Sequence, residues 1–409
     1  MRIQRSLILP SIIGLLLLAH CASKGLLTEK HEKSYYQVPM PNIQYPIPDS
    51  LSKFIVYSDN QAGWRVQHKF FNRESWASPK MFFFPFYELY LVGNGIIGGI
   101  NWLRQMPDYG KRERLLVRDA IYREYFQSHS SFILNVGDIC AYDGRRPIHW
   151  EIFLNEYKIE HPLLNEIPYF AVVGNHERAN DSTYGMPNYQ AVFNLPRFYV
   201  IEFENAALFI LDSNYLIDQN KHIDDKQQDL LFRKWFVSAE TDTAPSWLEN
   251  QLKKYYKKFK IIAMHHPPVA FAHHYQDWQT VRFGKGLEKK RITLIQLFSR
   301  FGVDLVFSGH EHIYQHNMLT LEDGRNIHFL LGGGGGTPLR HFIDEKTRHK
   351  FNHWFSNQGF EISLLNQARI HHYYLTEIYG DTLSVKILEV TGNKELPTKV
   401  FEEIKIVKN

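Results

Sequence analysis

The chain has 409 residues, of which 44% are apolar, and its formal net charge is +4. This composition is too apolar for a disordered chain and supplies enough material for a large hydrophobic core. The small net charge gives no support to a nucleic-acid partner, and we predict none. The length allows two or three domains, but no linker-like break interrupts residues 59–312, where the polar motifs lie. We therefore predict one large domain over residues 51–395.

The first twenty residues have the pattern of an export signal. Arg2 and Arg5 form a basic start, and residues 6–19 form an apolar stretch too short for a comfortable bilayer span. The stretch ends at Cys21 and resembles a bacterial lipoprotein signal, in which that Cys becomes the lipidated first residue. An ordinary secretory signal and an uncleaved anchor are the alternatives. We predict cleavage of residues 1–20 and an exported protein held at the bacterial envelope or surface by a lipid anchor.

Residues 21–50 are polar and contain four prolines, so we predict an extended tether between the lipid and the domain. Apolar runs then predict strands at 54–57, 132–136, 169–173, 198–202, 207–211, 258–264 and 303–308.

Helical periodicity covers residues 111–126, with Leu115, Ala120, Ile121 and Phe126 expected to face inward. Ser246 has the pattern of a helix N-cap, with Glu249 at the capping-box position, and another helix is predicted near 288–300. Strands that alternate with helices favour an α/β fold with parallel pairing.

The end of the domain is predicted to be mostly β. Apolar runs at 327–331, 371–378 and 382–388 indicate strands, and Gly380-Asp381 predicts a tight hairpin turn. We expect residues 396–409 to be a C-terminal tail. The glycine run at 332–336 lacks the signature of a phosphate-binding loop, so close backbone approach is its favoured role.

An aromatic-rich insertion is predicted at about residues 62–110. Its prolines and glycines argue against a transmembrane helix. The favoured interpretation is a segment that packs on the domain. The alternative is a lid or apolar wall beside the active site.

Polar clusters follow five of the predicted strands. Side chains at the carboxyl ends of parallel strands converge on one crevice, so these clusters predict a single site. Their carboxylate, carboxamide and imidazole ligands suit Fe, Mn, Zn or Co rather than a Cys-rich structural zinc. They are too numerous for one tetrahedral ion, so we predict two divalent or trivalent ions that share Asp138. The clusters are Asp59-Asn60-Gln61, Gly137-Asp138, Gly174-Asn175-His176-Glu177, His265-His266-Pro267 and Gly309-His310-Glu311-His312.

The order of these clusters resembles the calcineurin-like metallophosphoesterase superfamily, closest to its purple-acid-phosphatase-like branch, over about residues 52–390. The resemblance implies a four-layer α/β/β/α sandwich, in which two mixed sheets lie face to face between helices. It assigns one metal to Asp59, Asp138 and His312. It assigns the other to Asp138, Asn175, His265 and His310.

The resemblance also makes His176 the catalytic residue, which stabilises the transition state or protonates the leaving oxygen. Two positions depart from the family pattern. Gln61 stands where most members have a histidine, and Tyr142 lies one residue beyond the position of the metal-binding tyrosine of purple acid phosphatases. Both are kept as additional metal or substrate candidates, and the shift does not favour a tyrosine-ligated ferric site. Other histidines, including His273 and His274, are expected to be ordinary surface or core residues.

We therefore expect a metal-dependent hydrolase of phosphoric esters, with monoesters slightly favoured over diesters. Two cations neutralise charge on the phosphoryl oxygens and lower the pKa of a bound water, so that hydroxide attacks phosphorus in line. The alternative is a non-catalytic surface binding protein that retains the fold. Degenerate ligands would mark it, and Gln61 and Tyr142 are the positions that point that way. Metal identity, physiological substrate and oligomeric state are left open.

Overall fold

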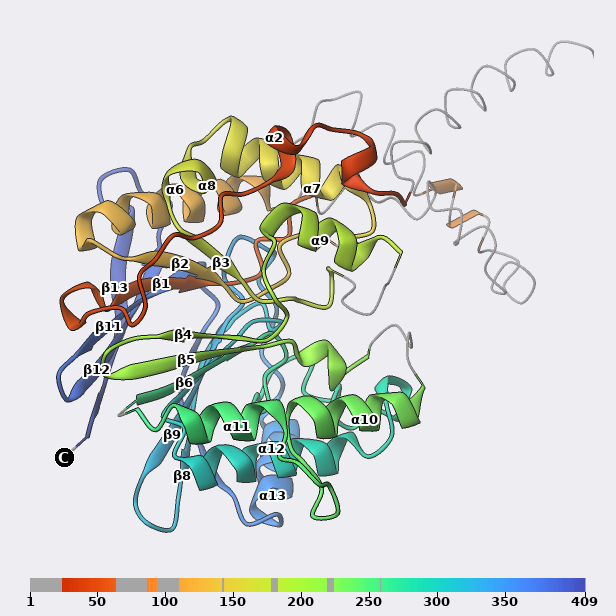
Figure 1. Ribbon diagram of the computed structural model, residues 1–409, viewed down its shortest axis with the longest axis vertical. Coiled ribbons are helices and arrows are strands. Elements are labelled where there is room, and N and C mark those ends of the chain that lie inside the picture. Colours follow the sequence, from red (N-terminus) through yellow and green to blue (C-terminus); the bar gives the residue numbers. More distant parts are fainter. Residues whose placement is uncertain are drawn as a thin grey trace, which may run out of the picture.

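Two mixed sheets lie face to face between layers of helices in the computed structural model (Figure 1). The structure describes residues 24–63, 87, 89–90, 92–93, 110–141, 143–177, 183–218, 224–257 and 259–408. The predicted α/β class and four-layer sandwich are confirmed. The predicted signal peptide, Cys21 and nearly all of the 62–110 insertion lie outside the described residues. Within the described part, no helix is both long enough and apolar enough to cross a membrane.

The first sheet has six strands in the order β13-β12-β11-β1-β2-β3. Strands β1, β2 and β3 are parallel, and β11 joins β1 antiparallel. Helices α2, α6, α7, α8 and α9 cover its outer face (Figure 1). The strands are β1 Lys53–Tyr57, β2 Phe132–Asn135, β3 Tyr169–Ala171, β11 His372–Tyr379, β12 Thr382–Val390 and β13 Thr398–Val407; the helices are α2 Lys33–Tyr36, α6 Lys111–Ser128, α7 Pro147–Leu154, α8 Leu163–Glu166 and α9 Gly185–Phe193.

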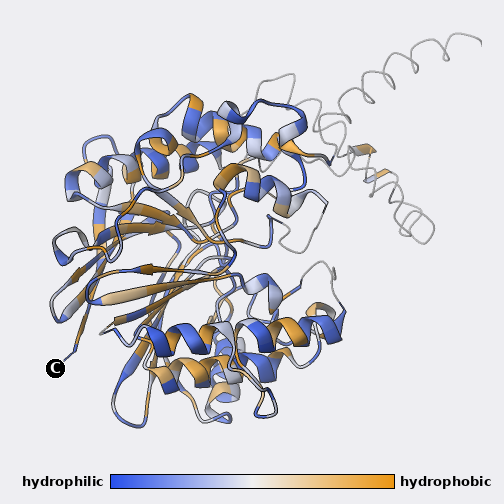
Figure 2. Ribbon diagram, in the orientation of Figure 1, coloured by the Kyte–Doolittle hydropathy of each residue, from blue (hydrophilic) through white to orange (hydrophobic). Residues whose placement is uncertain are grey.

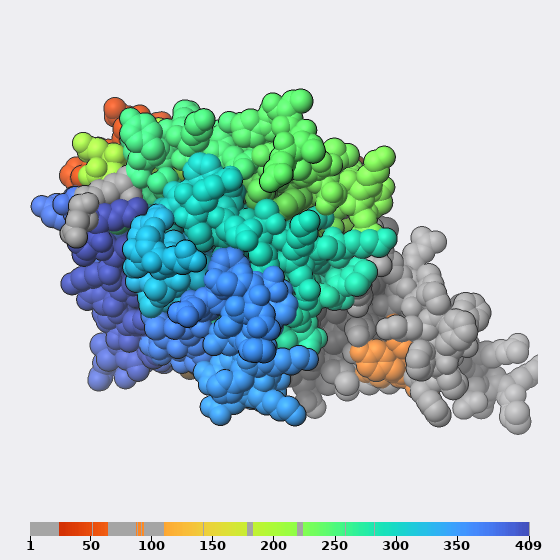
Figure 3. Space-filling view, turned by 90° about the horizontal axis from the view of Figure 1, so that it is seen from below, coloured from red at the N-terminus to blue at the C-terminus, as the bar shows by residue number. Residues whose placement is uncertain are grey.

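The second sheet has seven strands in the order β10-β8-β9-β7-β6-β5-β4. Strands β5, β6, β7 and β9 are parallel to one another. Helices α10 to α13 cover its outer face (Figure 1), and the green, teal and blue segments that contain them lie side by side on the face seen from below (Figure 3). The strands are β4 Tyr199–Glu202, β5 Ala206–Leu211, β6 Phe259–Met264, β7 Leu305–Ser308, β8 Tyr314–Thr320, β9 Asn326–Gly332 and β10 Glu361–Ala368; the helices are α10 Asp225–Trp235, α11 Trp247–Lys254, α12 Leu287–Phe301 and α13 Glu345–Ser356.

Side chains that alternate between the two faces of each sheet contribute to two hydrophobic cores. In β5, Ala206, Leu208 and Ile210 pack in the core between the sheets, whereas Ala207, Phe209 and Leu211 pack against the helices of the second sheet. A strand buried on both faces needs an almost continuous apolar run, which is what the sequence has at these positions. The central strands are accordingly orange in Figure 2, and the helices show mixed colours.

Local sequence patterns correctly predicted the start of one helix and the position of one hairpin. Ser246 caps α11, and the Ser246–Glu249 capping box is present as predicted. The predicted hairpin joins β11 to β12 at Gly380. In α6, however, the inward face is partly different: Ala120 and Ile121 are buried, but Phe126 is 48% exposed.

The reason for this difference is a buried ion pair. Arg114 is fully buried and donates from Nε and Nη2 to the two carboxylate oxygens of Glu156, at 2.7 and 2.8 Å. The helix face that carries the paired Arg114 is therefore buried, together with Val117, and Phe126 in the last turn lies near solvent. Periodicity of apolar residues alone does not anticipate a charged residue on the buried face.

Both ends of the domain also differ from the prediction. The proposed tether carries Leu27, Val38 and Ile47, all buried in the core of the first sheet, so residues 24–52 pack on the domain instead of extending away from it. Residues 398–407 of the proposed tail form β13, paired antiparallel with β12. Most β13 side chains are exposed or half-buried, so this edge strand is held mainly by backbone hydrogen bonds and has a weak apolar pattern.

Candidate metal centre

Every predicted metal-binding cluster follows a strand of the two sheets. Asp59, Asp138 and Asn175 come after β1, β2 and β3 of the first sheet. His265 follows β6, and the His310–His312 loop follows β7, both in the second sheet. Because these strands run parallel within each sheet, their carboxyl ends bring the clusters to one edge of the sandwich.

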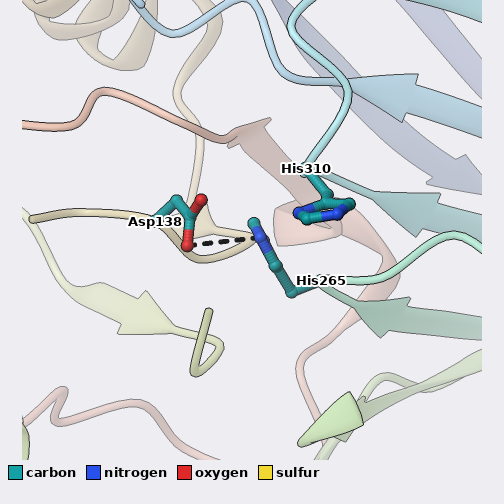
Figure 4. A group of neighbouring side chains, drawn as sticks. All are labelled: Asp138, His265 and His310. Atoms are coloured by element: carbon teal, nitrogen blue, oxygen red, sulfur yellow. Dashed lines mark ion pairs between the residues drawn. The ribbon is translucent and has the colours of Figure 1, made fainter. Parts of the chain in front are cut away.

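Four side chains form a compact group at the centre of this edge. His265 Nε2 lies 3.0 Å from Asn175 Oδ1 and 3.3 Å from Asp138 Oδ1. His310 Nδ1 also lies 3.0 Å from Asn175 Oδ1. Figure 4 shows Asp138 and His265 facing each other, joined by their ion pair, with the His310 ring beside them. One carboxylate, one carboxamide and two imidazoles are the donor set predicted for one of the two metals.

The backbone around these side chains is strained. Asp59, Asp138 and His310 have φ values of 60°, 55° and 70°, a region that non-glycine residues rarely occupy. Such conformations persist where the surrounding structure enforces them, often at functional sites. The three residues are all predicted metal ligands, so the turns aim these side chains at a cost in backbone energy.

Glycines permit the loops to approach one another. A Cβ on Gly309 would lie 2.0 Å from Ser58 Oγ and 2.5 Å from Asp59 Oδ2, so only glycine fits beside the first loop. The glycine run at 332–336 packs behind the same loops. A Cβ on Gly335 would lie 2.2 Å from the Ser58 carbonyl oxygen. Close backbone approach, the role predicted for this run, is confirmed.

A second group of ligands surrounds Asp59. His312 Nε2 lies 3.5 Å from Asp59 Oδ1, and Gln61 Nε2 lies 3.1 Å from Asp138 Oδ2. Within the described residues, Asp59 Oδ1 and Gln61 Oε1 are buried acceptors that receive no hydrogen bond. Two orphaned acceptor oxygens beside the Asp138 carboxylate fit a cation, so this corner is compatible with a second metal. Tyr142 lies outside the described residues.

The electrostatics also suit metal binding. Burial lowers the pKa of His310 to about 3, so its ring is neutral and available as a ligand. Burial also lowers the pKa of His265, but the carboxylates of Asp138 and Asp59 outweigh it and raise the value to about 10. Burial alone would raise the pKa of Asp138, whereas the charges of His176 and His265 bring it well below its usual range. Asp138 is therefore an ionised carboxylate at neutral pH.

A family model described as "Calcineurin-like phosphoesterase" matches residues 57–314, more than half of the chain. The chain belongs to the calcineurin-like phosphoesterase family. It is 28% identical to mouse (Mus musculus) acid phosphatase type 7 over 233 residues, which are 53% of this chain and 48% of that protein. It is 29% identical to human (Homo sapiens) acid phosphatase type 7 over 168 residues, 38% of this chain and 34% of that protein. The chain thus spans about half or less of the curated relatives it matches.

A solved structure has the same fold. Purple acid phosphatase PPD1 from yellow lupin (Lupinus luteus) superimposes with a TM-score of 0.54 at 13% identity, covering 87% of this chain and 53% of that one. The predicted superfamily is confirmed by the family model.

In this calcineurin-like phosphoesterase, His176 lies at the rim of the centre. Its side chain is 18% exposed, and its Nε2 lies 3.5 Å from Asp138 Oδ2. Its backbone N–H donates to Asp138 Oδ1 at 3.0 Å, which fixes the carboxylate beside it. An imidazole that reaches solvent next to the shared carboxylate is placed to meet a substrate entering from outside.

Sequence reasoning missed the residues that support the ligands. Asp277 Oδ2 lies 2.9 Å from His310 Nε2, and His274 completes a second cluster with these two residues. His274 thus lies beside the predicted ligand His310, with ring centroids 4.3 Å apart, where an ordinary surface or core histidine was expected. The short spacing between His274 and Asp277 is the signal in the sequence that could have indicated this cluster, because their loop has no helical or strand periodicity.

Glu177, the last residue of its motif, is a support rather than a ligand. Its buried carboxylate accepts hydrogen bonds from the backbone N–H groups of Asp138, Gly174, Ile139 and Cys140, at 2.8 to 3.1 Å. It thus ties the loop after β3 to the loop after β2. A carboxylate that satisfies four donors fixes the backbone that aims Asp138 and Asn175.

Proposed function

We propose that this chain is a metal-dependent hydrolase of phosphoric esters, with monoesters favoured over diesters. The observation that carries the proposal is the convergence of Asp138, Asn175, His265 and His310 at the strand ends of a calcineurin-like phosphoesterase domain. The names of the matched relatives, both acid phosphatases, support the monoester preference.

The proposed centre holds two divalent or trivalent ions of the Fe, Mn, Zn or Co class. When bound, they supply Lewis-acid chemistry that activates a water and neutralises charge on phosphoryl oxygens. Asp138, Asn175, His265 and His310 provide four ligands for one ion. Asp59, Asp138 and His312 hold the other, with Gln61 as a weaker neutral donor. We therefore propose that the two ions bind with unequal affinity.

We propose that His176 acts on the leaving oxygen. Its partly exposed ring lies beside Asp138 at the rim of the centre. An imidazole at this place can bind a phosphoryl oxygen or, when protonated, donate its proton as the ester bond breaks. Asp138 then has two roles, as the shared ligand and as the acceptor that holds the His176 backbone N–H.

Metal analysis combined with a substrate panel tests the proposal. The purified protein should bind close to two equivalents of metal and release phosphate from an aryl monoester faster than from an aryl diester. Asp138→Asn should abolish this activity because it weakens both ligand sets, whereas Asp323→Asn on the surface should leave it unchanged. Metal binding without hydrolysis of any ester would instead identify the non-catalytic binding protein.

We also propose that the protein is exported and held at a membrane by lipid on Cys21. The basic start, the short apolar stretch and the following cysteine support this proposal. Cys21→Ser should move the protein from the membrane fraction to the soluble fraction without changing hydrolysis. A membrane-bound Cys21→Ser variant would contradict the lipid anchor and favour an uncleaved apolar segment.

A further inference from the structure

A cavity lies behind the metal centre, between the loop after β6 and helix α12. It has room for about one water-sized species, since the 210 Å³ of empty space there includes open solvent. Apolar and aromatic side chains such as Ile217, Ala270, Tyr275 and Trp278 make up about half of its wall. His310 and Asp277 close the side toward the metals, and Arg291 of α12, His266 and His274 complete it. The cavity is therefore separate from the predicted ligand sets but shares a wall with them.

Arg291 brings an unpaired positive charge to this cavity. Its side chain is fully buried, and its Nε donates to the Pro268 carbonyl oxygen at 2.5 Å. Within the described part of the chain, its Nη1 and Nη2 have no hydrogen-bond partner. The surface residue Glu288 is the carboxylate that acts on its pKa, which burial lowers to about 9, so the group is cationic at neutral pH.

Aromatic rings stabilise the faces of this guanidinium but not its N–H groups. The Arg291 carbon Cζ lies 4.6 Å from the Phe355 ring centroid, 4.8 Å from that of Phe351 and 5.5 Å from that of Trp354. The N–H bonds lie in the plane of the guanidinium and need acceptors there. Four such hydrogens, on Nη1 and Nη2, remain unsatisfied, and an unsatisfied buried donor is costly.

His266 adds a further donor to the same cavity. Ser213 Oγ accepts from the His266 backbone N–H at 2.9 Å, and the same oxygen lies 2.8 Å from His266 Nδ1. The Ser213 hydroxyl can donate to Nδ1, and the ring hydrogen then lies on Nε2. That Nε2 is buried and has no partner among the described residues. In the cavity wall, the buried side-chain atoms of the described residues that lack a partner are therefore nitrogens of Arg291 and His266.

We propose that this cavity is a binding site for a small monovalent anion of the halide class, held by Arg291 and His266. An anion accepts hydrogen bonds from several donors at once and supplies a negative charge to pair with the Arg291 guanidinium. The apolar half of the wall favours a weakly hydrated ion over a strongly hydrated phosphate dianion, whose desolvation costs more. Asp277 faces the cavity too, and its negative charge further disfavours a dianion.

The anion would stabilise the loop that carries His265. Arg291 already holds this loop through the Pro268 carbonyl oxygen, and His266 is the neighbour of His265. Binding between Arg291 and His266 closes a connection from α12 to the end of β6. We therefore expect anion binding to raise the thermal stability of the whole protein, whether or not metal is bound.

Thermal unfolding of the full chain in chloride against gluconate, at constant ionic strength and pH, tests the site. Gluconate is too bulky for the cavity and serves as the reference anion. In the wild type, the melting temperature should rise with chloride along a saturable curve. Arg291→Met should lose that rise. Arg300→Met is the matched control, because Arg300 lies on the same helix with 61% of its side chain exposed, and it should keep the rise.

Diffraction from wild-type crystals grown with bromide gives a second readout that needs no variant. An anomalous peak within hydrogen-bond distance of Arg291 and His266 is expected. The proposal is overturned if chloride and gluconate give the same melting temperature, if Arg291→Met and Arg300→Met respond alike, or if only water occupies the cavity in bromide.

Discussion

The hydrogen bond between Asp277 and His310 should control metal affinity, and Asp277→Ala tests this. His310 turns Nδ1 toward the metal group and Nε2 toward Asp277, whose carboxylate oxygen is 2.9 Å away. A ring that binds metal through Nδ1 carries its hydrogen on Nε2, and Asp277 accepts that hydrogen. The carboxylate thus fixes the tautomer and the ring orientation and makes Nδ1 more basic.

The magnitude follows from the burial of the pair. Both residues are at least 91% buried, so the alanine variant leaves the Nε2 hydrogen of His310 without an acceptor. Loss of such a supporting partner typically weakens metal binding by about 10- to 100-fold, which corresponds to ~1.4–2.7 kcal/mol. Asp277→Asn keeps an acceptor oxygen but removes the charge, so its loss should be smaller than that of alanine.

Competition between the metal-stripped protein and a chromophoric chelator measures the affinity of each equivalent. Only the equivalent bound by Asn175, His265 and His310 should weaken, and Asp323→Ala on the surface should change neither. Circular dichroism checks that the variants are folded. If Asp277→Ala binds both equivalents as tightly as the wild type, the hydrogen bond does not position His310 for metal.

Three other predictions concern protonation, the weaker metal and the fold. Metal uptake at pH 7 should release about one proton, because the raised pKa of His265 keeps its ring protonated until a cation displaces the proton. The metal affinity should therefore increase with pH. Calorimetry in buffers of different ionisation enthalpy counts the released protons, and uptake without proton release would contradict this prediction. Gln61→His should tighten the weaker equivalent, since imidazole is a better donor than carboxamide for these metals; an unchanged metal titration would remove Gln61 from the site. Glu156→Ala should lower the free energy of unfolding by about 3–5 kcal/mol, because it removes the buried carboxylate that pairs with the buried Arg114 guanidinium. Urea unfolding measures this loss, and a value under ~1 kcal/mol would mean that the pair adds little to stability.

The sequence predicted those parts of the fold in which local chemistry and long-range packing agree. The buried strands β1, β2, β5 and β6 are apolar runs, and each ends where polar residues begin. The parallel arrangement of such runs is enough to bring Asp59, Asp138 and His265 together. For this reason the convergence of these side chains was predictable from the sequence.

Other features depend on contacts that no local pattern records. The role of Asp277 depends on its contact with His310, which is remote in the sequence. The face of α6 is set by the distant Glu156. Strand β13 is an edge strand whose side chains alternate only weakly between exposed and buried. In each case a partner remote in the sequence decides the outcome, and periodicity does not identify that partner.

The position of β1 has a consequence for synthesis of the chain. Phe54 of β1 pairs with Phe132 on one side but with Thr376, near the end of the chain, on the other. Pairings between such remote residues close late during folding. A nascent chain that carries Asp59 and Asp138 lacks His265, His310 and His312 until most of it has been made. The proposed metal centre can therefore form only after the chain up to His312 has been made, and the early carboxylates alone offer the unfinished chain no tight site.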